Sequence, residues 1–149
     1  MMAVFTSKIN SKSDLFNKNK DDFTKLIKKM EDIHSRAEIV SERRRSKFIE
    51  RGQLTPRERL YKLLDKDEIF IELFNMISFL VDDDNHDTSV SGGSIIAGIG
   101  FVCGVRCIVF VDDSGINAGA LTAKSIDKAL GCLDTVSYTH LRAHETNVD

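Results

Sequence analysis

Two short runs rich in β-branched residues, separated by a Cys-Gly pair, constrain the fold of this 149-residue chain more than any other feature. The first run spans residues 95–102 and the second spans residues 107–111. Runs of this length and composition, bounded by turn residues, are typical of strands. Cys103-Gly104 suits the tight turn of a hairpin. The sequence therefore predicts a β-hairpin.

A loop of small residues, 112–120, follows the second run, and a helix is expected from about Thr122. Small residues and glycine allow close approach to the backbone. A strand, a small-residue loop and a helix start can point N–H groups at an anion or a carbonyl. A tight connection between a helix and a strand is the equally good alternative. The helix is expected to bury a stripe formed by Ile126, Ala129, Leu130 and Leu133.

An amphipathic helix is predicted from Phe23, because seven apolar residues fall three or four positions apart on one face. The helix is expected to end at Gly52, which suits a left-handed C′ position. Basic residues at 43–51 are interpreted as a solvated helix end that complements the dipole, and a phosphate-facing patch is the alternative. The apolar face consists of Phe23, Leu26, Ile27, Met30, Ile33, Ala37 and Val40.

A second, shorter helix has a strong start signal. Thr55 suits the N-cap, Pro56 suits the first helical position, and Glu58 completes a capping box. The segment at 69–74 that follows this helix is rich in β-branched and aromatic residues, which predicts a strand.

Three other patterns fail as ligand motifs. The acidic run at 82–87 lacks the glycine and glutamate of a calcium loop, so a solvated loop is expected. Gly98-Ile99-Gly100 is followed by more strand rather than by a helix, which excludes a dinucleotide fingerprint. Cys103 and Cys107 have no second cysteine pair for zinc, so both are expected to be buried thiols. No metal site is predicted.

Composition excludes several functions. The chain has 21 Lys plus Arg and 23 Asp plus Glu, a net charge of −2, which argues against electrostatic binding of nucleic acid or anionic membranes. No apolar run reaches the roughly 18 residues of a membrane-spanning helix. Three cysteines give no disulfide framework and indicate a reducing compartment.

Several blocks, in order, resemble one family. Residues 51–60 read RGQLTPRERL, residues 70–73 read FIEL, and the stretches 97–104 and 107–120 follow, with Asp127-Lys128 after them. These blocks are similar to the carboxyltransferase (β) subunit of biotin-dependent acyl-CoA carboxylases, from about Phe23 to Thr135. Departures at Asp112, Asn117-Ala118-Gly119, Gly131 and Leu133 affect the substrate assignment more than the family assignment.

The resemblance implies an α/β fold. It would comprise a long N-terminal helix and a short capped helix, followed by the start of a crotonase/ClpP-like β-β-α domain, truncated. Residues 1–18 are assigned to a disordered start, 19–66 to a helical N-terminal segment, and 67–135 to a partial crotonase-like domain.

Residues 136–149 resemble a translated sequencing adapter and are expected to lie outside the fold, as a probable artefactual tail. Local propensity alone could form a helical turn at 141–145. The His140 and His144 pair in this tail is therefore not assigned to a metal.

The resemblance also implies carboxyl transfer from carboxybiotin, carried by a partner, to the α-carbon of an acyl-CoA. No catalytic residue is assigned, because the family's oxyanion turns match nothing here, and this chain alone is expected to be inactive. The alternatives are a biotin-dependent CoA-ester decarboxylase subunit and a non-catalytic α/β interaction domain. The residues expected to bind acyl-CoA are Asn117, Ala118, Gly119, Ala120 and Lys128.

Implied partners are the acyl-CoA substrate, the biotin carboxylase and biotin carrier subunit, and further copies in a homo-oligomer of the full-length subunit. Neither nucleic acid nor a membrane is an expected partner. The expected compartment is the cytoplasm, with the mitochondrial matrix as the alternative.

Overall fold

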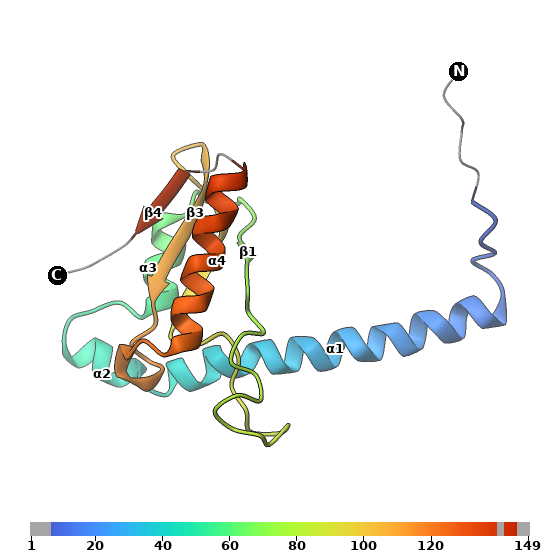
Figure 1. The fold of residues 1–149 in the computed structure, drawn as a ribbon, viewed down its shortest axis with the longest axis horizontal. Coiled ribbons are helices and arrows are strands. Elements are labelled where there is room, and N and C mark those ends of the chain that lie inside the picture. Colours follow the sequence, from blue (N-terminus) through green and yellow to red (C-terminus); the bar gives the residue numbers. More distant parts are fainter. Residues whose placement is uncertain (1–6, 140–141, 146–149) are drawn as a thin grey trace. The chain divides into compact units, whose positions relative to one another are not determined.

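A computed structural model describes residues 7–139 and 142–145 (Figure 1). Two compact units divide the chain after Asp32, and each is described by itself. The helices are α1 (Asp14–Glu42), α2 (Arg45–Glu50), α3 (Pro56–Leu63) and α4 (Ala123–Thr139), with a short 3-10 turn at Asn117–Gly119. The strands are β1 (Ile71–Glu72), β2 (Ile95–Val102), β3 (Val105–Asp112) and β4 (Arg142–Glu145).

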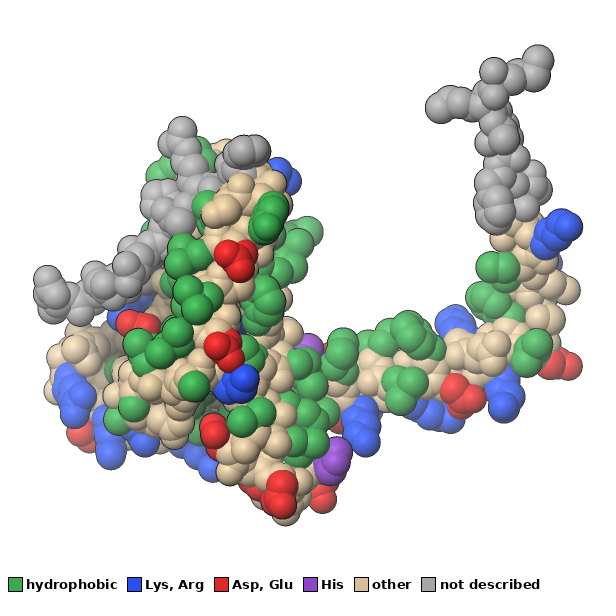
Figure 2. Space-filling model, viewed as in Figure 1, with side chains coloured by type: hydrophobic (Ala, Val, Ile, Leu, Met, Phe, Trp, Pro, Cys, Tyr) green, Lys and Arg blue, Asp and Glu red, His purple; other side chains and the backbone are tan. Residues whose placement is uncertain are grey.

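The first unit contains the N-terminal part of α1. This helix begins at Asp14, inside the segment that the sequence assigned to a disordered start, so that boundary is wrong. Ser13 explains the earlier start, because its hydroxyl accepts a hydrogen bond from the Phe16 N–H at 3.2 Å and acts as an N-cap. Figure 2 shows hydrophobic side chains along this part of the helix, and the exposed ones are Leu15, Phe23, Leu26, Ile27 and Met30.

The predicted single helix up to Gly52 is two helices. α1 ends at Glu42, and the Arg44 N–H donates to the Ser41 carbonyl at 3.0 Å in a tight turn before α2. The turn follows Ser41, which is buried within the second unit and donates to Asp113 Oδ1 at 2.6 Å, a tertiary contact that periodicity does not show. Gly52 adopts a φ of +67° after α2, as predicted for a C′ glycine.

α3 starts as predicted. The Glu58 N–H donates to Thr55 Oγ1 at 3.3 Å, and the Thr55 N–H donates to Glu58 Oε2 at 2.9 Å, which completes the capping box. Leu60, on the inner face of the helix, is fully buried.

The four strands form one sheet in the order β1-β2-β3-β4. β2 and β3 pair antiparallel from Ile95 opposite Asp112 to Val102 opposite Val105, which confirms the hairpin. β1 pairs antiparallel with β2, and β4 runs parallel to β3. β1 is shorter than the predicted strand at 69–74, because Phe74 has a φ of +51° that extended backbone does not accommodate.

The core lies on both faces of the β2–β3 hairpin, and Figure 1 shows α3 and α4 on opposite sides of it. One cluster contains Leu60 of α3 with Ile96, Cys107, Val109 and Val111; the other contains Cys132 of α4 with Ile95, Ala97 and Ile108. Gly98 lies within β2, where a Cβ would overlap the Ile71 carbonyl oxygen. This glycine therefore serves strand packing rather than a dinucleotide.

α4 turns a different face inward from the one predicted. Ile126, Leu130 and Leu133 are exposed, so the expected buried stripe is wrong. The helix packs through a face of small and polar residues, because the Ser125 hydroxyl bonds to the Ser94 N–H at 3.2 Å and fixes the rotation of the helix. The buried residues of α4 are Ser125, Lys128 and Cys132.

Two further expectations need correction. Cys107 is buried as predicted, but Cys103 is exposed because it occupies the hairpin turn. The expectation that the tail lies outside the fold is wrong for its described residues, because α4 continues to Thr139 and β4 (Arg142–Glu145) pairs with β3. The helical turn that local propensity could form is a strand over the described residues 142–145, since pairing with the edge of a sheet overrides weak helix propensity. His140 lies outside the described residues, and the adapter-like origin of the tail stays a prediction.

Candidate functional site

The loop between β3 and α4 contains three consecutive residues with left-handed backbone. Asn117, Ala118 and Gly119 have φ values of 46°, 55° and 80°. Glycine adopts this region without strain and asparagine tolerates it, whereas a left-handed alanine such as Ala118 costs about 1–2 kcal/mol. Such strain persists only where the surroundings impose it, and it clusters at ligand sites. This loop, residues 117–120, is the one that the sequence singled out, and we call it the 117–120 loop.

Asp113 anchors the near side of this loop. Its Oδ1 accepts hydrogen bonds from the Ser41 hydroxyl at 2.6 Å and from the Gly115 N–H at 2.9 Å. Its carbonyl accepts from the Ile116 N–H at 3.0 Å, and its own N–H donates to the Ser94 carbonyl at 2.8 Å. The residue is 2% exposed. Burial raises the pKa of the Asp113 carboxyl, although the bonds from Ser41 and Gly115 oppose that effect.

Serine and threonine hydroxyls anchor the far side. Ser94 Oγ donates to the Ala120 carbonyl at 2.9 Å, and Thr122 Oγ1 accepts from the Ser125 N–H at 3.2 Å as the N-cap of α4. The bond from Ser94, just before β2, reaches the 117–120 loop itself, and the other bonds fix the segments on either side of it to α1 and to the start of α4.

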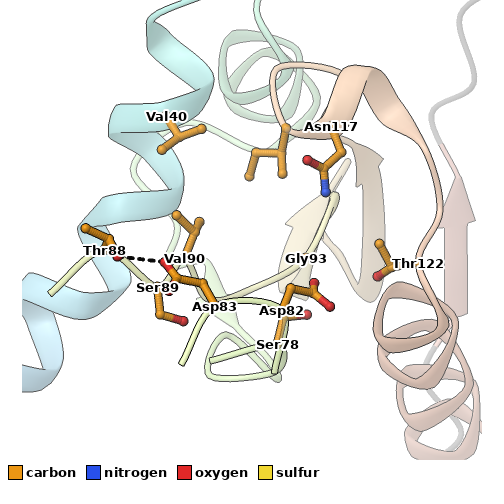
Figure 3. A pocket seen from close by; sticks show the side chains of 11 residues that line it. Val40, Ser78, Asp82, Asp83, Thr88, Ser89, Val90, Gly93, Asn117 and Thr122 are labelled. Atoms are coloured by element: carbon orange, nitrogen blue, oxygen red, sulfur yellow. Dashed lines mark hydrogen bonds between the residues drawn. The ribbon is translucent and has the colours of Figure 1, made fainter. Parts of the chain in front are cut away.

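A polar cavity of about 190 Å³ adjoins the loop. Figure 3 shows Asn117 and Thr122 lining it opposite the segment that carries Ser78 and Asp83. Ser78 Oγ is buried and has no hydrogen-bond partner among the described residues. Asp83 accepts from the Thr88 hydroxyl at 2.7 Å, a bond drawn in Figure 3, and its pKa is lowered chiefly by that bond.

A basic cavity lies on the other side of the loop. It has a volume of about 150 Å³, and Arg44, Lys47 and Arg51 line it together with Ser114 and Ala118. These cations belong to the basic run that the sequence interpretation took for a solvated helix end. Lys47 and Arg51 are exposed at this helix end, and all three cations also lie beside the strained loop, so both interpretations of the basic run stay open.

A larger cavity of about 410 Å³ shares Phe48 and Ser114 with the basic cavity. Leu54 and Arg59 also line it, and Arg59 donates to the Asp112 carbonyl at 2.9 Å. The two cavities together offer an apolar wall and a set of cations next to the 117–120 loop.

Lys128 lies apart from the loop residues with which the sequence grouped it. The side chain is fully buried, and Nζ donates to the Gly92 carbonyl at 3.2 Å. Burial lowers the pKa of this ammonium. The sequence grouped Lys128 with the residues expected to bind acyl-CoA, and a fully buried ammonium bonded to a backbone carbonyl differs from that expectation.

Sequence reasoning missed the anchoring residues. Asp112 and Asp113 are adjacent, and no local pattern tells that the second is buried while the first is exposed. Ser41 lies within a long helical repeat, where a single serine gives no signal. Arg57, which is mostly buried, was also missed. Burial works to lower the Arg57 pKa, but Glu72 and Glu38 outweigh that effect and raise it.

Within residues 7–139 and 142–145, no group of three or more His, Cys, Asp or Glu side chains is arranged to hold a metal ion. In the same part of the chain, no helix has both the length and the apolar character needed to cross a bilayer.

Comparison with protein families gives a match to the carboxyl transferase domain over residues 47–147, about two thirds of the chain. The chain belongs to the carboxyl transferase domain family. The match includes α3, the β2–β3 hairpin and the 117–120 loop, and it reaches into the segment that was expected to be an unrelated tail.

Curated relatives of this carboxyl transferase chain are much longer. The biotin-dependent 3-methylcrotonyl-coenzyme A carboxylase beta1 subunit of Mycobacterium tuberculosis is 32% identical over 105 residues, which is 70% of this chain and 17% of that protein. A probable biotin-dependent acyl-coenzyme A carboxylase beta2 subunit of the same organism is 35% identical over 80 residues, or 54% of this chain and 14% of that protein. The chain thus spans less than a fifth of either relative.

Solved structures share the fold of the carboxyl transferase chain. The β subunit of Pseudomonas aeruginosa geranyl-CoA carboxylase superposes with a TM-score of 0.86 at 28% identity, over 97% of this chain and 27% of that one. The transcarboxylase 12S subunit superposes with a TM-score of 0.62 at 21% identity, over 78% of this chain and 24% of that one. These likenesses confirm the predicted resemblance and the crotonase-like carboxyltransferase fold.

Proposed function

We propose that this chain is part of an acyl-CoA carboxyltransferase and that it binds the CoA portion of the substrate at the 117–120 loop. The proposal rests on one observation: Ala118, a left-handed residue of the strained loop, also lines the basic cavity. A strained backbone with an exposed Asn117 and Ala118 beside three cations suits a long ligand that bears phosphates.

The successive parts of CoA each match one part of the proposed site. Arg44, Lys47 and Arg51 would contact its phosphates, since guanidinium groups bind phosphate oxygens in pairs. The larger cavity, with Phe48 and Leu54 on its wall, would receive the adenine ring. The pantetheine arm would then pass along the backbone of the 117–120 loop. Lys128 would act indirectly in this arrangement, because its ammonium holds the Gly92 carbonyl.

The proposed reaction moves a carboxyl group to the α-carbon of the acyl thioester. The α-carbon would lose its proton to the biotin released in the transfer, and negative charge would develop on the thioester oxygen as an enolate. The new carbon–carbon bond would form to the carboxyl carbon, whose bond to the biotin nitrogen breaks. Preorganised N–H donors stabilise such an oxyanion, and loss of one donor typically slows a reaction by about 10²–10³-fold. Carboxybiotin, carried by a partner subunit, supplies the carboxyl group, and we assign no described residue to it or to the oxyanion.

The proposal extends to partners and compartment. A full-length subunit would assemble with further copies of itself and with a biotin carboxylase and biotin carrier subunit. The bacterial cytoplasm fits this assignment, and so does the mitochondrial matrix, because a relative from Drosophila melanogaster, 27% identical over 144 residues, is named as mitochondrial.

Calorimetric titration of the chain with CoA and with dephospho-CoA tests the proposal. We expect CoA to bind and Arg51→Glu to raise the dissociation constant at least tenfold, because reversing a charge beside a phosphate changes attraction to repulsion. Lys62→Glu, the same charge change on the outer face of α3, is the matched control and should stay within twofold of the wild type. Absence of CoA binding, or equal loss in both variants, would contradict the proposal.

A further inference from the structure

The 117–120 loop holds a strained backbone, yet its own hydrogen bonds are few. Within the loop region, the Gly119 N–H donates to the Ile116 carbonyl at 2.8 Å and the Ala120 N–H donates to the Asn117 carbonyl at 3.1 Å. Short i to i+3 bonds of this kind do not select a left-handed path over a relaxed one. Something outside the loop must therefore hold its conformation.

Asp113 is the point where the loop is fastened to α1. A single oxygen, Oδ1, accepts both the Ser41 hydroxyl at 2.6 Å and the Gly115 N–H at 2.9 Å. One bond fixes the carboxylate to the helix, and the other fixes the start of the turn that leads into the loop. The carboxylate is thus shared between the start of this turn and Ser41, which lies 72 residues before Asp113 in the sequence.

Gly115 and Ser41 are in close van der Waals contact. A Cβ at Gly115 would overlap Ser41 Oγ and would lie 2.7 Å from Ser41 Cα. The turn therefore rests directly on the backbone of α1 at Ser41. Movement of either one requires movement of the other, which is the condition for a contact to set the position of a loop.

The chain passes from the end of α1 at Glu42 through a tight turn into the basic cluster. In that turn the Arg44 N–H donates to the Ser41 carbonyl at 3.0 Å, and Arg44 lines the basic cavity with Ala118 of the loop. The contact at Asp113 thus fixes both sides of the basic cavity relative to each other. Positioning of this kind matters because a displacement of about 1 Å at a site can cost about 10²-fold in rate.

We propose that Asp113 and Ser41 are positioning residues that hold the 117–120 loop in its left-handed conformation against α1. The link to CoA affinity rests on the proposed function; the link to loop conformation does not. The acceptor oxygen is the group that acts, so an asparagine at position 113, which keeps an oxygen in the same place, should preserve the conformation.

Amide hydrogen exchange of the ligand-free chain tests the conformational part. Asp113→Ala should speed exchange at Ile116, Gly119 and Ala120 at least tenfold, and Ser41→Ala, which removes one bond and adds no volume, about threefold. Asp113→Asn should stay within threefold of the wild type. The matched control is Asp112→Asn, which changes the exposed neighbouring carboxylate and should leave these amides unchanged.

The same variants are then titrated with CoA. Tenfold weaker binding by Asp113→Ala, with rescue by Asp113→Asn, supports the proposal. Unchanged loop exchange in both Asp113→Ala and Ser41→Ala overturns it, as does equal acceleration at the β2–β3 amides, which would indicate a general loss of stability. If the wild type does not bind CoA, the proposed function fails and the exchange data alone decide the positioning role.

Discussion

Two turns in this molecule share left-handed backbone and a supporting aspartate, but their surroundings differ. The hairpin turn at Cys103-Gly104 and the 117–120 loop both contain consecutive left-handed residues, and an aspartate supports each of them. At the hairpin, the Asp65 carboxylate accepts the Cys103 N–H at 2.7 Å and the Gly104 N–H at 2.6 Å. At the loop, Asp113 accepts the Gly115 N–H and the Ser41 hydroxyl.

The surroundings separate the two turns. A Cβ at Gly104 would meet nothing within 4 Å, whereas one at Gly115, in the turn that leads into the 117–120 loop, would overlap Ser41. The hairpin turn projects from the sheet and closes two strands, which requires only local geometry. The 117–120 loop lies between two cavities and against a helix. We infer that left-handed backbone indicates a ligand site only where neighbouring elements, rather than the sequence of the turn itself, impose that conformation.

The largest expected difference between the turns comes from adding one methyl group to each. Gly115→Ala should destabilise the chain by about 3 kcal/mol, because the new Cβ has no room against α1. Gly104→Ala should cost about 1 kcal/mol, since it meets only the penalty of a left-handed alanine. Urea unfolding of both variants measures the difference. Equal losses in the free energy of unfolding would show that the surroundings constrain the two turns equally.

Removal of the hairpin aspartate should have a smaller effect. Asp65→Ala removes two hydrogen bonds to an ionised group at an exposed position, and we expect a loss of about 1.5 kcal/mol in the free energy of unfolding. CoA affinity should not change, because neither Asp65 nor the hairpin turn lines the two cavities of the proposed CoA site. A loss of CoA binding by a folded Asp65→Ala protein would remove the distinction between the turns.

The smallest effect concerns pH. Burial raises the native pKa of Asp113 above its usual 3.8, so the native state binds more protons than the unfolded state between the two values. Stability supplied by this group is therefore present below the unfolded pKa and falls as pH rises through the native pKa. The stability of the wild type minus that of Asp113→Asn should decrease with pH over that window. A flat difference curve from urea midpoints would contradict a buried, perturbed carboxyl.

Local sequence patterns predicted the features that depend on local geometry. The Thr55–Glu58 capping box, the left-handed Gly52 and the Cys103-Gly104 hairpin were all read directly from neighbouring residues. The small-residue loop before α4 was singled out in the same way. Its residues could be named from sequence, but its strain and its anchoring could not.

Features fixed by distant contacts were missed. The inward face of α4 carries Ser125 and Lys128 rather than its leucines, because bonds to Ser94 and Gly92 set the rotation of the helix. The break after Glu42 depends on the burial of Ser41 against Asp113. The pairing of β4 depends on an available edge of β3. None of these contacts has a signature within a short window of sequence.

The most direct test of the account is the footprint of CoA on the two turns. Backbone amide signals of the wild-type chain are recorded by nuclear magnetic resonance during titration with CoA. We predict saturable shifts at residues 114–120 and at Arg51, with the Cys103 and Gly104 amides unmoved. Saturable shifts confined to the hairpin turn, or no shifts at the 117–120 loop at saturating CoA, would contradict this prediction.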